Sequence, residues 1–141
     1  MLDRDAQHNI SNCEISGTIG SAISYHSAGE VSPLLTMERN RIMNNCKQLY
    51  GNFSTCEAAV RVNVQNMQSL FFRNNLLQEN QGGISLNSDS RGAATSLRAF
   101  INNNLFVKNK NRPSLYAEGK TGSPYQEVTI FKNYFTQNMA G

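Results

Sequence analysis

The sequence predicts an all-β repeat fold, in which short parallel strands are stacked coil upon coil into a solenoid. Three observations predict it: a frame of apolar and Asn residues that returns at similar intervals, apolar residues that alternate before each frame, and a composition poorly supplied for an ordinary globular core. The 141 residues are 39% hydrophobic and 16% charged, and they include no Trp. A chain of this kind buries apolar side chains by stacking each repeat on the next.

The repeat frame is an apolar residue, two residues, Asn, one residue, a second apolar residue, two residues and a second Asn. Four copies are complete, and a degenerate copy precedes them with Cys13 in the first Asn position. The central positions 13, 40, 75, 104 and 133 are separated by 27, 35, 29 and 29 residues, lengths typical of solenoid coils. We therefore expect about five coils. The central positions of the four complete copies are Asn40, Asn75, Asn104 and Asn133.

Short strands are predicted on both sides of each frame. Before the central Asn, apolar residues alternate with others, as in Leu70 and Phe72, which is typical of a strand with one buried face. After the frame, segments 22–27, 59–63 and 83–88 share one alternating template, with a weaker instance at 114–116. Helical spacing is not sustained anywhere, so each coil is expected to contain two or three strands.

The repeated Asn residues have two physical roles in this interpretation. Asn tolerates the left-handed backbone conformation of a sharp turn, and like amides hydrogen-bond from coil to coil when coils stack about 4.8 Å apart. The central Asn residues should form one such ladder. A second column is expected at Asn45, Asn80, Asn109 and Asn138. Inside the coils, an apolar column is expected from Ile15, Ile42, Leu77, Phe106 and Phe135.

Cysteines flank a polar excursion from the second coil. A disulfide between Cys46 and Cys56 would tie down a segment that lacks strand pairing, whereas two free thiols in a reducing compartment are the alternative. Cys13 is the odd cysteine, and it is either a buried inert thiol or the partner of a cysteine elsewhere in a longer chain. The three cysteines, with His8 and His26, never fall at the short paired spacings of zinc ligands, so no metal site is expected.

Two Asn-x-Ser sequons begin at Asn9 and Asn52. Asn9 precedes the inward Ile10 and is therefore expected on the outer face, while Asn52 lies between the two paired cysteines. Both are expected to carry glycans. The sequons and the disulfide together predict an extracellular location, secreted or in the ectodomain of a membrane protein.

The frame resembles the repeats of the right-handed parallel β-helices of the pectin-lyase-like superfamily, over roughly residues 8–141. Its long irregular loops, sequons and loop cysteines resemble the extracellular β-helix regions of a large invertebrate adhesion protein of tricellular junctions. The resemblance implies that residues 1–141 form a single right-handed parallel β-helix domain, a fragment of a longer helix. Loop insertions are expected at 26–33, 45–58, 87–96 and 117–127.

Enzymes with this fold hold paired carboxylates on a parallel sheet for acid and base work or for calcium binding. No two carboxylates meet on neighbouring coils at the outward positions two and four residues before the central position, so no catalytic residue and no cofactor is expected. The net charge of +3 is small and scattered, which excludes a nucleic-acid partner. No apolar run of about 18 residues exists, so this segment is not expected to enter a membrane.

Aromatic side chains are expected on the outer face of the last coils. Phe71 and Phe100 should stand one above the other, with Phe131 close by on the last coil. Exposed aromatics in a row predict a contact surface for a neighbouring domain, another protein or sugar rings. The alternative is that the loop at 87–96 folds over them.

The sequence thus predicts an extracellular structural or adhesive module of a larger, membrane-associated glycoprotein, active in cell–cell or matrix contact and without a reaction of its own. Its partners are expected to be neighbouring domains of the same chain, and another protein or a glycan. The alternative is a glycan-binding or polysaccharide-cleaving β-helix whose active residues lie outside this segment.

Overall fold

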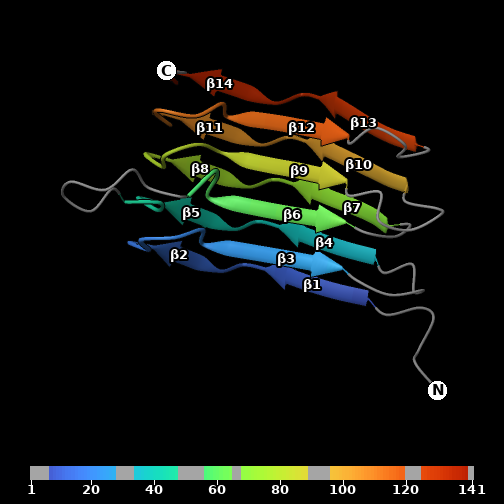
Figure 1. Cartoon of the computed structure of the whole chain (residues 1–141). Coiled ribbons are helices and arrows are strands. Elements are labelled where there is room, and N and C mark those ends of the chain that lie inside the picture. The colour runs from blue at the N-terminus through green and yellow to red at the C-terminus, as the bar shows by residue number, and fades with distance from the viewer. Residues whose placement is uncertain are drawn as a thin grey trace.

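The computed structural model of the chain describes residues 7–27, 34–47, 56–64, 68–88, 96–119 and 125–139 (Figure 1). Within these ranges the chain forms fourteen strands and no helix. Every pairing between these strands is parallel, and the strands belong to three sheets. Successive strands along the chain belong to different sheets, and each sheet gains one strand per coil. This arrangement is compatible with a β-helix or solenoid, as the repeat frame predicts.

Each sheet collects the strands from one side of the coils. The first sheet contains β1 (Gln7–Ser11), β4 (Leu34–Glu38), β7 (Gln68–Arg73), β10 (Ser96–Asn102) and β13 (Tyr125–Phe131). The second contains β2 (Glu14–Ser16), β5 (Arg41–Met43), β8 (Leu76–Gln78), β11 (Leu105–Val107) and β14 (Tyr134–Thr136). The third contains β3 (Ile23–Ser27), β6 (Val60–Val64), β9 (Ile84–Ser88) and β12 (Leu115–Gly119).

The core is a set of apolar columns that run through the coils. In the second sheet, the expected column is in register from Ile15 to Phe135, and its three middle members are fully buried. The rings of Phe106 and Phe135 lie parallel, with their centroids 4.7 Å apart. In the third sheet, Val60 and Val62 lie beside Ile84 and Leu86 of the next coil, all fully buried. The period-two alternation of the sequence therefore corresponds to inward and outward side chains.

A side-chain amide ladder connects the coils on the turn between the first and second sheets. Asn75 Oδ1 accepts hydrogen bonds from the backbone N and Nδ2 of Asn40, both at 3.0 Å. Asn75 Nδ2 donates to Met37 O and to Asn104 Oδ1, both at 3.0 Å. Asn104 makes the same set of bonds to Phe72 O and to Asn133. Each middle amide is therefore fully paired although the residue is only 2% exposed.

The second column forms an equivalent ladder on the turn that follows the second sheet. Asn80 donates from its backbone N and Nδ2 to Asn109 Oδ1, and Asn109 donates in the same way to Asn138. Asn45 donates likewise to Asn80 Oδ1. In the first coil, Thr18 replaces the amide and donates from its N and Oγ1 to Asn45 Oδ1. Both predicted columns are thus present.

The left-handed residues, however, are not the ladder residues. Positive φ occurs one position earlier, as at Asn74 (57°), Asn103 (55°) and Lys132 (52°), and the ladder Asn residues themselves do not have it. Asn was expected to serve the turn and the ladder at one position, and that part of the prediction is wrong. The physical reason is that the amide must point inward to reach its neighbours, so the preceding residue reverses the chain.

Several strands continue into the expected loop insertions. β3 reaches Ser27, β9 reaches Ser88 and β12 reaches Gly119, because polar residues there pair with the neighbouring coil. β10 and β13 likewise begin at Ser96 and Tyr125, inside two of the expected insertions. The central parts of all four insertions lie outside the described residues.

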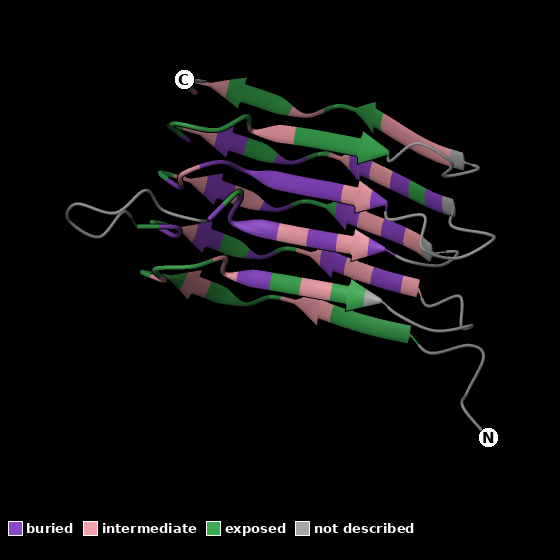
Figure 2. Cartoon of the chain, in the orientation of Figure 1, coloured by how far each residue is buried: buried purple, intermediate pink, exposed green. Residues whose placement is uncertain are grey.

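Burial is greatest in the middle coils (Figure 2). Each inward side chain is covered by the coils on its two sides, so a side chain in an outer coil is covered on one side only by the described residues. Phe135 is 47% and Ile130 is 49% exposed, whereas Phe106 and Ile101, one coil earlier, are fully buried. Stacking between coils therefore supplies most of the apolar burial.

Replacing Asn104 with Leu should destabilise the chain far more than replacing Asn102 with Leu. The first change removes the acceptor of the buried Asn75 backbone N and the side-chain donor to Phe72 O, at about 1–3 kcal/mol for each group left unpaired. Asn102 is half-buried and points outward at the end of β10, and a change there should stay within about 0.5 kcal/mol. Urea unfolding of the two variants measures the difference, and equal midpoints would contradict the ladder's contribution.

Candidate functional site

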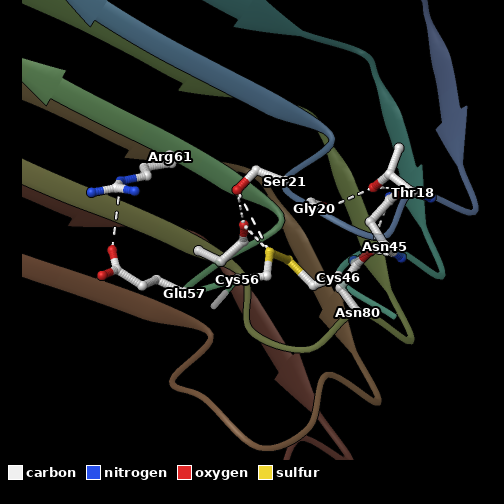
Figure 3. Close-up of a disulfide and its surroundings, with 10 residues drawn as sticks. Thr18, Gly20, Ser21, Asn45, Cys46, Cys56, Glu57, Arg61 and Asn80 are labelled. Carbon is white, nitrogen blue, oxygen red and sulfur yellow. Dashed lines mark hydrogen bonds and ion pairs between the residues drawn. A yellow bond between two sulfur atoms is a disulfide. The ribbon is translucent and has the colours of Figure 1, made fainter. Parts of the chain in front are cut away.

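The expected disulfide joins Cys46 and Cys56, whose Cα atoms are 5.5 Å apart (Figure 3). Both cysteines are buried. The backbone N of Cys46 donates to Gly20 O at 3.2 Å, and Ser21 Oγ, which donates to Ala58 O at 2.8 Å, lies 3.6 Å from Cys56 Sγ. The bond therefore holds the start and the end of the excursion against the first coil.

The disulfide gives a stability prediction. The chain-entropy relation for a loop of this length gives about 2–3 kcal/mol for the bond. We expect non-reducing peptide mapping of secreted chain to find Cys46 linked to Cys56, and the Cys46→Ala/Cys56→Ala variant to lose about that much free energy of unfolding. The matched control, Cys13→Ala, should change stability by less than about 0.5 kcal/mol. Two free thiols in secreted material would contradict the pairing.

Cys13 is exposed and free, so the interpretation of this residue as a buried thiol is wrong. Its backbone N donates to Asn40 Oδ1 at 3.0 Å, as a ladder residue would, but its Sγ turns back to Ser11 O at 3.3 Å. A ladder Asn donates two hydrogen bonds from Nδ2 and accepts at Oδ1, whereas the single thiol hydrogen of Cys13 is directed to Ser11 O. Cys13 therefore does not extend the side-chain ladder. Its pairing with a cysteine elsewhere in a longer chain stays a prediction.

Of the two sequons, one lies within the described residues. Asn9 is exposed on β1, and the next residue, Ile10, packs against the core, so Asn9 points outward as expected. Asn52 lies outside the described residues. Glycan attachment at either site stays a prediction.

The expected aromatic residues lie on the outward side of the first sheet. Phe71 and Phe100 are register partners, and their rings are stacked with centroids 5.1 Å apart and planes 10° apart. Both are half-buried. Phe131, which is 44% exposed, is in register with Asn102 and so belongs to the adjacent column. Residues 89–95 of the loop expected to cover them lie outside the described residues.

Ion pairs cross the same face between neighbouring coils. Glu38 Oε2 accepts from Arg73 Nε at 2.8 Å, while Glu38 Oε1 accepts from Arg39 at 2.8 Å. Arg98 and Glu127 approach to 3.3 Å on the last two coils. On this face, the described carboxylates are therefore paired with arginines.

A groove of about 670 Å³ lies over the outward side of the third sheet. Register brings its residues together in two columns, which cross the four strands of that sheet. In one column Ser85 lies between Arg61 and Tyr116, and in the other Asn87 lies beside Asn63. The groove is lined by His26, Glu57, Ala58, Arg61, Asn63, Ile84, Ser85, Asn87, Ser88, Arg112, Pro113, Tyr116 and Glu118.

The polar groups of the groove are incompletely paired among the described residues. Asn87 Nδ2 donates to Asn63 Oδ1 at 3.1 Å, but Asn87 Oδ1 is buried without a hydrogen-bond partner. Arg61 Nε is also buried without one, although it lies 3.5 Å from a carboxylate oxygen of Glu57. Such groups gain most from a ligand that brings both donors and acceptors.

Tyr116 adds an aromatic side chain at the groove and is 45% exposed. Its hydroxyl donates to Glu118 Oε2 at 3.2 Å, and this hydrogen bond, with the nearby negative charges, raises the pKa of Tyr116 above its ordinary value. An exposed aromatic face among polar side chains suits a sugar ring or another amphipathic ligand.

Sequence reasoning missed this groove. Strands of the first sheet lie at a constant sequence distance before the central Asn, so the frame predicts which of their residues face one another. Strands of the third sheet do not keep a constant distance from the frame. Arg61 follows Asn40 by 21 residues, whereas Ser85 follows Asn75 by 10, because the cysteine excursion precedes β6. The shared alternating template of segments 22–27, 59–63 and 83–88 was the available signal, and its outward members include Arg61, Ser85 and Asn87.

No group of three His, Cys, Asp or Glu residues that could hold a metal ion occurs among the described residues. The described part of the chain also has no helix with the length and apolar character needed to cross a membrane.

Together, the coil register and the ladders are compatible with a repeat protein of the β-helix or solenoid class. In sequence, the chain is 62% identical over 138 residues to the protein named Protein bark beetle of Drosophila melanogaster, and the match covers 98% of the chain. It spans 4% of that relative's length, so the similarity is to one short segment of a much longer protein. This agrees with the resemblance to a large invertebrate protein. No family model and no solved structure matches the chain.

Proposed function

We propose that this chain is a segment of a right-handed parallel β-helix, of the pectin-lyase-like kind, that serves as a non-catalytic structural and adhesive module outside the cell. The observation that carries the proposal is the amide ladder, which runs from Asn40 to Asn133 and makes the described coils one continuous stack. A stack whose buried amides bond to both neighbouring coils is suited to hold a fixed shape.

The disulfide supports the extracellular part of the proposal. Structural disulfides persist in oxidising compartments and are rare in the cytosol. The similarity to a small segment of a very long relative supports the modular part. The module would then present its outer faces to neighbouring domains of its parent chain and to a protein or glycan partner, and the parent would be a membrane-associated glycoprotein of cell junctions.

The non-catalytic part of the proposal predicts no turnover of polysaccharides. Purified secreted chain incubated with pectin, alginate and related polymers, with and without calcium, should release no new chain ends. Acid and base groups must be held within reach of one bond, and on the first sheet Glu38 and Glu127 each face an arginine. A polysaccharide lyase serves as the positive control, and cleavage by the chain would refute the proposal.

Glycan binding at the groove is the second candidate function. It is favoured by one observation, the exposed Tyr116 in the same groove as the incompletely paired Arg61 and Asn87. A sugar can place an apolar ring face on an aromatic side chain while its hydroxyl groups both donate and accept hydrogen bonds. In this second candidate function, the groove binds a glycan without cleaving it.

Tyr116→Ala should weaken glycan binding about fivefold or more, since loss of a stacked aromatic contact costs about 1 kcal/mol or more. The probe is an array of defined oligosaccharides, followed by calorimetry with the strongest binder. Tyr134→Ala is the matched control, because Tyr134 is 65% exposed but lies on the second sheet, outside the groove. Equal losses for the two variants, or no binding to any oligosaccharide, would contradict the groove as a glycan site.

A further inference from the structure

One outward column of the first sheet contains a sequon, a small residue and two aromatic rings in succession. Asn9 pairs in register with Thr36, Thr36 with Phe71, and Phe71 with Phe100. These residues come from four coils, so the chain separates them widely while the sheet places them on adjacent strands. Adjacent strands lie about 4.8 Å apart, and the backbones at Asn9 and Phe71 are therefore about 10 Å apart.

The stacked rings leave one aromatic face directed toward Asn9. The ring planes of Phe71 and Phe100 differ by 10°, and Phe100 lies on one side of Phe71. The other side of the Phe71 ring faces the row of Thr36, whose short side chain extends less far from the sheet than a phenyl ring. Phe71 is half-buried, so an apolar surface remains there for a further group.

The residues around Thr36 offer one apolar and one polar border. Leu34 precedes it by two residues on the same outward side, and Glu38 follows it by two. Glu38 is held by Arg39 and Arg73 at 2.8 Å. A group lying over Thr36 would thus meet Leu34 before it and the fixed charge of Glu38 after it along β4, and the ring of Phe71 on the next strand.

We propose that an N-linked glycan on Asn9 folds along this column and packs the apolar face of its first sugars against Phe71. The N-acetylglucosamine pair that begins such a glycan has apolar ring faces, which suit Leu34 and Phe71, and polar edges, which suit the charged groups at Glu38. A neighbouring domain, another protein and sugar rings were the contacts expected for Phe71 and Phe100. The column favours sugar rings, and Asn9 of the same chain would carry them. The inference rests on the proposed extracellular function, because N-glycans are added in the secretory pathway.

The test compares the glycan's contribution to stability with and without the aromatic ring. The full chain is secreted from animal cells as wild type and as Phe71→Ser, each with the sequon intact and with Ser11→Ala, which removes the sequon but keeps Asn9. Loss of the glycan should lower the Tm by about 3–6 °C in the Phe71 background and by less than about 1 °C in the Phe71→Ser background. The second sequon at Asn52 is present in all four proteins.

Phe131→Ser provides the matched control, because Phe131 is an exposed phenylalanine of the adjacent column. In that background, loss of the glycan should lower the Tm as much as in wild type. Equal glycan-dependent shifts with and without Phe71 would overturn the inference. Secreted, disulfide-linked chain that carries no glycan at Asn9 would overturn it as well and leave the proposed function intact, whereas a chain that reaches the medium with Cys46 and Cys56 as free thiols would contradict the proposed function.

Discussion

The side-chain hydrogen bonds between stacked Asn residues are the interaction on which the rest of this structure depends. Each middle amide bonds to the coil before it and the coil after it, as Asn75 does with Asn40 and Asn104. These groups are buried, so a shift of one coil against the next would leave polar atoms unpaired at a high free-energy cost. The ladder therefore fixes the register of the three sheets, and with it every inward and outward column.

A fixed ladder also explains how coils of different length fit together. The separations of 27, 35, 29 and 29 residues between central positions differ only outside the turn that the ladder occupies. The longest coil contains the excursion between Cys46 and Cys56, whose ends are buried and covalently joined. The two ends of the excursion therefore lie at one place on the stack. Insertions can thus change the surface of the solenoid without changing its interior.

The frame predicted most of the fold because it encodes two separable requirements. Alternation sets which side chains point inward, and recurrence of Asn sets which coils lie side by side. The frame could not say which residue reverses the chain, because Asn favours left-handed φ and often occupies that position too. In the pairs Asn74–Asn75 and Asn103–Asn104, the first residue has positive φ and the second forms the ladder. The groove was not predicted because its residues keep no constant distance from the frame.

The division between ladder and surface has a consequence for function. Outward residues such as Phe71 and Tyr116 lie on strands and not in the turns that hold the amides, so substitutions there and in the ladder should act on stability almost independently. The ladder nevertheless sets the positions of these outward residues, because it fixes the register and therefore which residues lie on adjacent strands. A stack of parallel coils can therefore place an aromatic ring, an ion pair and a sequon Asn at set distances on one sheet. The chemistry of the outer faces then depends on which residues occupy the outward columns, while the interior stays the same.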